Sequence, residues 1–473
     1  MNKLIIFFCC LLFASNNKAQ KAEPILMTKK MISNIDTTTV EPLVGNQIYN
    51  AKVLDNFFKR LKDNENHSNH KINIVHIGDS HIQSDLMTNE IRKDLQKELG
   101  NAGRGFIFPY SLAKTNGSYN ERFRSNKVWE SYRNILPVKD CPMGLSGIAL
   151  WRNTDGFVIE VNVKDPVYKF NTIKIITPKN QHMFDLATRI QTNMIQSSER
   201  KVITHKIKKG EAISLIADKY NVSIAEIKRA NHLKSNAIRA GRTLKIVTNE
   251  TRPKTISQSQ YVPLDIESDS FSHYYNTEQA LDKIYLIPNK DAKKYELNGL
   301  ILEKNSSGLI YSGIGVNGAK FSDYNKYPVF FEQLKSLHPD MIVLSLGTNE
   351  SYDRLEASSY IKQLREFISN LKAQNIHVPV LVMTPPPSLL KGRKPNTFVA
   401  DYTKHIYETA QTDGLAVWDL YNEFGGMQGI GKLKAEGLIG PDWVHYSKKG
   451  YEKQGNLFSK ALLNEYNNFK LKK

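Results

Sequence analysis

The stretch Ile77-Gly78-Asp79-Ser80-His81-Ile82 follows an apolar run, residues 72–77, and precedes a segment with helical periodicity. This order predicts a strand that ends where Ser80 begins and a helix that starts just after it. Such a junction places the Ser80 hydroxyl at the carboxyl edge of a parallel sheet, where α/β proteins bind their ligands. The unpaired N–H groups and positive dipole of the helix N-terminus lie beside it, which suits a nucleophile that must stabilise an oxyanion.

Three further segments carry residues that fit the same chemistry. Near the other end of the chain, Asp442-Trp443-Val444-His445 places an acid three residues before a histidine, and serine, histidine and aspartate are the parts of a nucleophilic triad. Gly318 follows a predicted strand and can present its backbone N–H closely, because it has no side chain. Asn349 follows another strand and can offer a side-chain amide at the same edge.

The alternation of strand and helix defines the fold class. Apolar runs at 341–346, 378–383 and 416–420 alternate with helical patterns such as 359–374, which predicts a parallel sheet with helices on both faces. Between about 105 and 310 short strand-like segments with turn signals predict an inserted β-sandwich instead. A compact basic unit at 203–248 divides this insertion in two.

The block set Ser80, Gly318, Asn349 and His445, with Asp442 three residues before the histidine, resembles the SGNH (GDSL) hydrolase superfamily over residues 51–105 and 310–473. The resemblance implies a flavodoxin-like α/β domain, a catalytic triad of Ser80, Asp442 and His445, and an oxyanion hole from Ser80, Gly318 and Asn349. It differs from the usual GDSL pattern in the polar His81 and in the long insertion before Gly318. The first feature resembles the branch of the family that acts on O-acetyl groups of cell-envelope polysaccharides. The second resembles the carbohydrate-binding-type module that is inserted in bacterial peptidoglycan O-acetylesterases.

Residues 203–248 resemble a LysM module along its whole length, with the order strand, helix, helix, strand. That family binds glycans containing N-acetylglucosamine between two loops. The resemblance carries this role to six positions: Gly210, Glu211, Ala212, Ile213, Asn231 and Leu233. The family commonly has Asp-Thr where this chain has Glu211-Ala212, a change that weakens the helix cap.

The N-terminus predicts export. Residues 1–20 have a short basic start, an apolar run and a small polar end, as in a signal peptide, and the run is too short to span a membrane. We therefore expect the following organisation: signal peptide 1–20, linker or arm 21–50, hydrolase 51–105 and 310–473, β-rich insertion 106–202 and 249–309, and LysM unit 203–248.

Composition restricts the partners. The 473 residues carry a formal net charge of +18, but basic runs with interleaved aromatic residues are absent, so nucleic acid is not expected as a partner. Once a signal peptide is removed, only Cys141 remains, which excludes an internal disulfide and a zinc site built from cysteine clusters. We expect no metal, no cofactor and no membrane span in the mature chain.

These features together predict a serine esterase of the periplasm or cell envelope. The expected reaction removes acetyl groups from the C6 hydroxyl of N-acetylmuramic acid in O-acetylated peptidoglycan strands. An O-acetyltransferase with the same triad, an acetyl esterase for another envelope or dietary polysaccharide, and an inactive glycan-binding adaptor are the alternatives.

Overall fold

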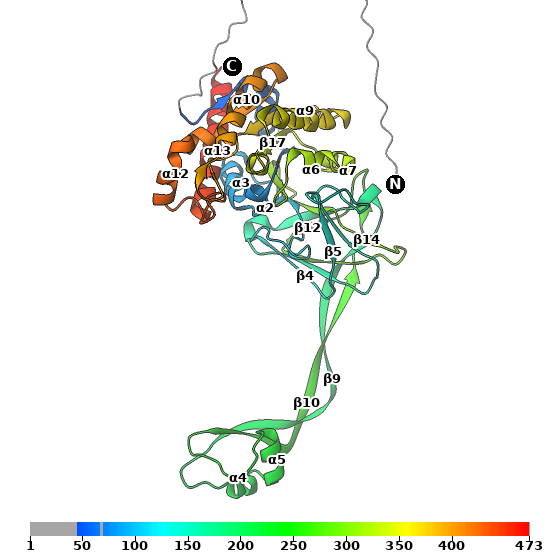
Figure 1. Ribbon diagram of the computed structural model, residues 1–473. Helices are drawn as coiled ribbons and strands as arrows, with labels where there is room; N and C mark the ends of the chain where they lie inside the picture. Colours follow the sequence, from blue (N-terminus) through cyan, green and yellow to red (C-terminus); the bar gives the residue numbers. More distant parts are fainter. Residues whose placement is uncertain (1–44, 67–69, 473) are drawn as a thin grey trace, which may run out of the picture. The chain divides into compact units, whose positions relative to one another are not determined.

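A computed structural model describes residues 45–66 and 70–472 (Figure 1). The expected signal peptide and most of the expected linker lie outside the described residues. The central sheet of the hydrolase domain has the strand order β1-β21-β18-β17-β2-β16. Its strands are β1 (Ile48–Tyr49), β2 (Lys71–Gly78), β16 (Gly308–Gly315), β17 (Met341–Ser345), β18 (Val380–Met383) and β21 (Ala416–Trp418).

All strands of this sheet except β1 are parallel. Numbered by their order in the chain, these five strands lie across the sheet as 2-1-3-4-5, the flavodoxin-like arrangement. The order reverses between β2 and β17, so the carboxyl ends of these two strands form the switch point at which ligands bind in such sheets. The sequence prediction of a parallel α/β sheet is confirmed.

One expectation about the N-terminal arm is wrong. Residues 48–49, placed in a linker by the sequence, form β1 and pair antiparallel with β21 at the sheet edge. The Trp418 Nε1–H donates to Asn46 Oδ1, and Asn46 Nδ2 donates to the Leu457 carbonyl oxygen. Ile48 is buried in the apolar cluster of the domain, but the segment is too short and too polar to show a hydrophobic periodicity, and specific side-chain hydrogen bonds help to hold it.

Helices cover both faces of the sheet. On one face α1 (Asp55–Asn66), α3 (Leu86–Leu99) and α13 (Lys448–Leu471) share one apolar cluster with Met341 and Val343 of β17. Ile342 and Leu344 of the same strand are also buried and point to the other face, because strand side chains alternate. On that face lie α6 (Phe321–Asn325), α7 (Pro328–Leu334) and α9 (Ala357–Ala373), whose aromatic rings pack together around Phe367.

Four more helices lie in the C-terminal half of the hydrolase domain. They are α8 (Thr348–Tyr352), α10 (Thr397–Asp413), α11 (Leu420–Glu423) and α12 (Gly426–Ala435). Tyr360 of α9 stacks on Tyr402 of α10 with ring centroids 4.2 Å apart. The glycine-rich stretch 425–429 forms the N-terminal part of α12, which begins at Gly426.

The insertion lies in the crossover between α3 and β16. It has a five-stranded antiparallel sheet of order β10-β9-β13-β7-β4, a second of order β11-β12-β8-β15-β3, and a three-stranded sheet β14-β6-β5. The strands are β3 (Gly105–Ile107), β4 (Glu121–Ser125), β5 (Glu130–Arg133), β6 (Ile148–Arg152), β7 (Ile159–Val163), β8 (Phe170–Ile176), β9 (Phe184–Lys206), β10 (Thr243–Pro263), β11 (Glu267–Ser268), β12 (His273–Leu281), β13 (Lys283–Pro288), β14 (Tyr295–Glu296) and β15 (Gly299–Glu303).

The LysM unit closes the long β9–β10 ribbon. Its helices are α4 (Ile213–Lys219) and α5 (Ile224–Ala230), and they enclose a small core with Leu244 and Ile246 of β10. Ser223 and Glu226 form a capping box that starts α5. The order strand, helix, helix, strand agrees with the sequence prediction.

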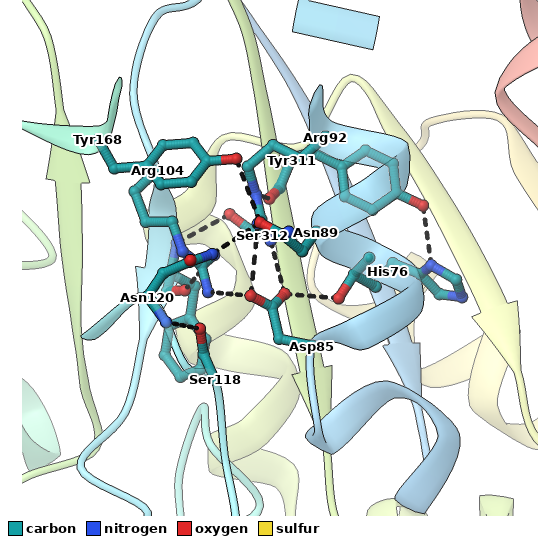
Figure 2. A network of polar contacts seen from close by, with 12 residues as sticks. His76, Asp85, Asn89, Arg92, Arg104, Ser118, Asn120, Tyr168, Tyr311 and Ser312 are labelled. Carbon is teal, nitrogen blue, oxygen red and sulfur yellow. Dashed lines mark hydrogen bonds and ion pairs between the residues drawn. The ribbon is translucent and has the colours of Figure 1, made fainter. Parts of the chain in front are cut away.

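Buried charges join the insertion to the hydrolase domain (Figure 2). Asp85 forms ion pairs with Arg92 of α3 and with Arg104, each at 2.8 Å, and Arg104 also pairs with Glu121 of β4. Burial alone would raise the pKa of Asp85, but the charges of Arg104 and Arg92 hold this pKa well below its usual value. These ion pairs fix β4 of the insertion to α3 of the hydrolase domain.

Candidate active site

The Ser80 hydroxyl lies at the junction predicted for it. Strand β2 ends at Gly78, and α2 (Ser80–Gln83) begins at the serine itself. Asp79 caps this helix, because its Oδ1 accepts the His81 N–H at 2.9 Å. A Cβ atom at Gly78 would lie 2.8 Å from the Ser345 carbonyl oxygen, so only glycine lets β2 and β17 approach closely here. The expected continuous helix is interrupted at Asp85, whose φ of 58° separates α2 from α3.

The histidine and aspartate complete a hydrogen-bonded relay. Ser80 Oγ lies 2.8 Å from His445 Nε2, and His445 Nδ1 lies 2.7 Å from Asp442 Oδ2. Asp442 Oδ1 accepts the N–H groups of Val444 and His445 at 3.0 and 2.9 Å. Trp443, between them, has a left-handed φ of 61°, which a bulky residue adopts only when its surroundings enforce it.

These contacts assign a tautomer and a charge. Partial burial works to raise the pKa of Asp442, but the hydrogen bonds from the His445 ring and two backbone N–H groups hold it below its usual value. An ionised Asp442 accepts a hydrogen bond from the N–H at His445 Nδ1, which leaves Nε2 free to accept a hydrogen bond from the Ser80 hydroxyl. The relay is open to solvent, since the side chains of His445 and Asp442 are 45% and 51% exposed.

Besides Ser80, two oxyanion donors are expected, Gly318 and Asn349, and both follow strands that pair with β2. Gly318 has a φ of 86° in the turn after β16, a conformation that favours glycine. The Asn349 side chain, at the start of α8, is brought to the same edge and bonds Asp79 Oδ2 at 3.1 Å and the Ala319 carbonyl oxygen at 3.0 Å. Through these bonds Asn349 links the nucleophile turn to the turn that carries Gly318.

Two other histidines are neutral parts of the scaffold. His76 is enclosed and contacts Tyr311 Oη and Ser345 Oγ, as expected for a packed core histidine. His81 lies beneath His445, with ring centroids 5.3 Å apart, and its Nδ1 contacts Tyr451 Oη. Burial lowers the pKa of both rings to about 3, so neither carries a charge near neutral pH.

Sequence reasoning missed two buried groups at the site. Glu350 is buried in α8, and its Oε1 accepts the Phe321 N–H at 2.9 Å. Gln83 is buried in α2 and bonds the backbone of Asn317, the neighbour of Gly318. Both are polar residues on the buried side of a short helix. Because tertiary contacts decide this burial, the sequence pattern does not identify either residue.

The six LysM positions separate into two groups. Ile213 and Leu233 pack in the LysM core, and Asn231 bonds both the N–H and the carbonyl oxygen of Lys245 at 2.7 Å. Gly210, Glu211 and Ala212 form the turn before α4, where Ala212 occupies the N-cap position without a capping side chain. Glu211 instead accepts from the Lys208 N–H at 2.7 Å and contacts His205 Nε2 at 2.8 Å.

The described residues contain neither a metal-binding cluster nor a membrane-spanning helix. Across residues 45–66 and 70–472, His, Cys, Asp and Glu side chains do not gather in groups of three or more that could hold a metal ion. In the same residues, every helix is too short or too polar to cross a membrane.

Comparison with family models identifies the two domains. Residues 297–453 match the GDSL-like lipase/acylhydrolase family, and residues 205–247 match the LysM domain. The chain carries a GDSL-like hydrolase domain and a LysM domain. The hydrolase match contains Gly318, Asn349 and His445, whereas Ser80 lies beyond it because the insertion separates the nucleophile from the rest.

Solved and curated proteins resemble this chain over different shares of its length. A structure of a peptidoglycan O-acetylesterase aligns with a TM-score of 0.55 and 18% identity over 87% of this chain and 96% of that one. The N-acetylmuramoyl-L-alanine amidase sle1 of Staphylococcus aureus is 35% identical over 107 residues, 20% of this chain and 28% of the amidase. The chain thus spans about a quarter of the length of the curated relatives it matches.

Proposed function

We propose that the protein is a serine esterase that removes O-acetyl groups from cell-wall peptidoglycan, at the C6 hydroxyl of N-acetylmuramic acid. The observation that carries the proposal is the Ser80–His445–Asp442 relay, with its 2.8 and 2.7 Å contacts, in one chain with a LysM domain. The relay supplies the chemistry of ester cleavage, and the LysM domain belongs to a glycan-binding family.

The first half of the reaction forms an acetyl-enzyme. Ser80 Oγ attacks the acetyl carbonyl carbon while its proton passes to His445 Nε2. The resulting O⁻ is stabilised by the N–H groups of Ser80 and Gly318 and by the amide of Asn349. Asp442 stabilises the imidazolium. When the intermediate collapses, the bond to the sugar oxygen breaks, and that oxygen takes the proton from His445.

The second half returns the free enzyme. Water occupies the place of the departed sugar hydroxyl, and His445 Nε2 accepts a proton from it as it attacks the acetyl-serine carbonyl. The tetrahedral intermediate forms in the same oxyanion hole and collapses to acetate and Ser80, whose oxygen regains the proton from His445. Water is the only co-reactant, so each turnover releases one acetate and one free sugar hydroxyl.

The accessibility of the site supports a polymeric substrate. With half of the His445 and Asp442 side chains exposed, an acetyl group on a long glycan can reach Ser80 without threading through a tunnel. The likeness to a peptidoglycan O-acetylesterase over nearly the whole of that structure, and to part of a wall amidase, supports peptidoglycan as the glycan. We infer an exported protein of the cell envelope, with 1–20 as signal peptide, because that is where this substrate lies.

Acetate release tests the proposal directly. Purified O-acetylated peptidoglycan and the same material after mild base treatment are incubated with the wild-type protein and with Ser80→Ala. We expect acetate from the acetylated wall with the wild type alone, and mass spectrometry of the digested wall should show the acetyl loss on muramic acid. An aryl acetate serves as the control for an intact triad.

Each outcome has a distinct meaning. Hydrolysis of the aryl acetate without acetate from the wall would reject peptidoglycan as the substrate. Loss of acetyl groups that reappear on added sugar acceptors, with little free acetate, would indicate a transferase. Equal activity of Ser80→Ala and wild type would reject the nucleophile.

A further inference from the structure

Gln83 connects the nucleophile helix to the turn that carries Gly318. Its side chain is buried, with 2% of the residue exposed, and its Oε1 accepts the Asn317 N–H at 2.6 Å. Its Nε2 donates to Thr115 Oγ1 at 2.9 Å and to the Asn116 carbonyl oxygen at 2.7 Å. One amide side chain therefore contacts the hydrolase domain on one side and the inserted domain on the other.

The side chain of Asn317 makes the matching contact. Its Nδ2 donates to Asn116 Oδ1 at 2.6 Å and to Thr115 Oγ1 at 3.2 Å. Asn317 is thus held at its backbone by Gln83 and at its side chain by the inserted domain. Since the peptide that follows carries the N–H of Gly318, these bonds restrict the direction in which that N–H points.

The inserted segment that makes these contacts, residues 110–120, is itself fixed to the hydrolase domain at both ends. Tyr110 Oη donates to the Gly315 carbonyl oxygen at 3.2 Å, and Asn120 Nδ2 donates to Asn89 Oδ1 at 2.6 Å. Figure 2 shows Asn120 and Ser118 next to the buried Asp85–Arg104 pair. A segment anchored in this way can act as a rigid support.

The inserted domain also reaches Gly318 directly. A Cβ atom built on Gly318 would lie 3.4 Å from Ile135 Cδ1, in the loop after β5. Two separate loops of the insertion therefore border the turn that supplies the backbone oxyanion donor.

We propose that Gln83 is a positioning residue for the oxyanion hole and that residues 110–120 of the inserted domain are part of the catalytic architecture. Gln83 touches neither substrate nor reacting atoms. It holds Asn317, and through it the Gly318 N–H, in the direction needed by the oxyanion. The inference rests on the proposed esterase chemistry at Ser80 but not on the identity of the glycan.

Two variants remove the contact from opposite sides. Gln83→Leu keeps a side chain of similar length and removes every hydrogen bond of the Gln83 amide, whereas Asn116→Ala removes an exposed side chain and leaves Gln83 in place. Asn153→Ala, an exposed amide elsewhere in the insertion, is the matched control. The full-length variants are compared by kcat and KM on an aryl acetate, by thermal unfolding, and by hydrogen exchange of the backbone in residues 313–321.

A positioning role predicts a loss in kcat. Misdirecting one donor costs less than deleting it, so we expect kcat to fall roughly 10–100-fold in Gln83→Leu and about 3–10-fold in Asn116→Ala, with KM within about twofold. The double variant should be no slower than Gln83→Leu alone, because both changes release the same peptide. Exchange in residues 313–321 should rise in both variants and stay unchanged in Asn153→Ala.

Several results would overturn the inference. They are a folded Gln83→Leu enzyme with kcat within twofold of wild type, a loss confined to KM, or additive effects in the double variant. If the wild type cleaves aryl acetate but leaves the wall acetylated, the proposed substrate fails while these comparisons still decide the role of Gln83. If it cleaves neither, unchanged exchange in residues 313–321 of both variants would reject the positioning role.

Discussion

The side-chain nitrogen of Asn349 lies 3.1 Å from Oδ2 of Asp79, the residue that precedes the nucleophile. The same nitrogen lies 3.0 Å from the Ala319 carbonyl oxygen, so both amide hydrogens have partners before substrate arrives. Burial raises the pKa of Asp79 to about 7. When this carboxyl is protonated, it accepts the hydrogen bond from the Asn349 amide more weakly. Asn349 must therefore share one of these hydrogens with a forming oxyanion.

Replacing Asn349 by alanine should lower kcat by roughly 10²–10³, as loss of one oxyanion donor usually does. KM should change less, because the ground-state carbonyl needs this donor less than the oxyanion does. Steady-state kinetics on an aryl acetate measure both values. A raised KM with an unchanged kcat would make Asn349 a ground-state binding residue.

Replacing Arg104 by methionine should destabilise the protein by about 3–5 kcal/mol, the usual cost of leaving a buried charge without its partner. The side chain of Arg104 is 4% exposed, and its loss leaves the buried Glu121 without this countercharge, whereas Asp85 keeps its ion pair with Arg92. Urea unfolding measures the loss.

The matched control is Arg365→Met, which breaks an exposed pair with Asp413 and should cost less than about 1 kcal/mol. Equal losses in the two variants would show that the buried network does not couple the inserted domain to α3. A change in the Arg104 variant confined to the unfolding of the insertion would place the network's effect in that domain alone.

The sequence predicted the α/β sheet and brought Ser80, Asp442 and His445 together because each pattern is local. An apolar run followed by a turn and a helical period defines each strand end, and the aspartate lies three positions before the histidine. The parallel order then follows from the packing of alternating strands and helices. The LysM unit was predicted for the same reason, since its whole core lies within one short segment.

The support of the site could not be predicted in this way. Gln83 and Asn317 meet only because β2 and β16 are neighbours, and Asn116 joins them only because the insertion folds back onto this edge. Polar residues in such bridges have no periodicity, and their burial is decided by tertiary contacts. The edge strand at Ile48 was missed for the same reason, since its hydrogen bonds lie far away in the sequence.

Replacing Glu350 by glutamine should flatten the pH dependence of stability. Burial raises the pKa of Glu350 to about 8, so the folded state keeps a proton that the unfolded state has lost above about pH 4.3. The stability of the wild type should therefore fall as pH rises from about 5 to 8, and this fall should be smaller in Glu350→Gln.

Thermal unfolding between pH 5 and 8 measures the difference between the two proteins. Glutamine keeps an oxygen that can accept the Phe321 N–H, so the contact with α6 is retained. Parallel curves for wild type and variant would show that Glu350 ionises at an ordinary pH and that its burial is relieved in solution.

Removing the LysM unit should separate wall association from chemistry. Val202 of β9 pairs with Val247 of β10, so residues 203–246 can be replaced by a two-residue Asn-Gly turn that closes the ribbon as a hairpin. The shortened protein should keep kcat and KM on an aryl acetate within about twofold, because Ser80, Gly318, Asn349 and His445 all lie outside the excised segment and folding of the remaining domains does not use the LysM core. It should sediment less with insoluble peptidoglycan than the full-length protein does.

The matched control replaces Glu211 by alanine, which removes its bonds to the Lys208 N–H and to His205 without removing the domain. If the shortened protein binds the wall as well as the full-length one, the LysM turn at 210–212 has lost its ligand and the β-rich insertion becomes the glycan-binding part. If it stays folded but no longer cleaves the small ester, the LysM unit contributes to the active site and the division of labour between the domains is wrong.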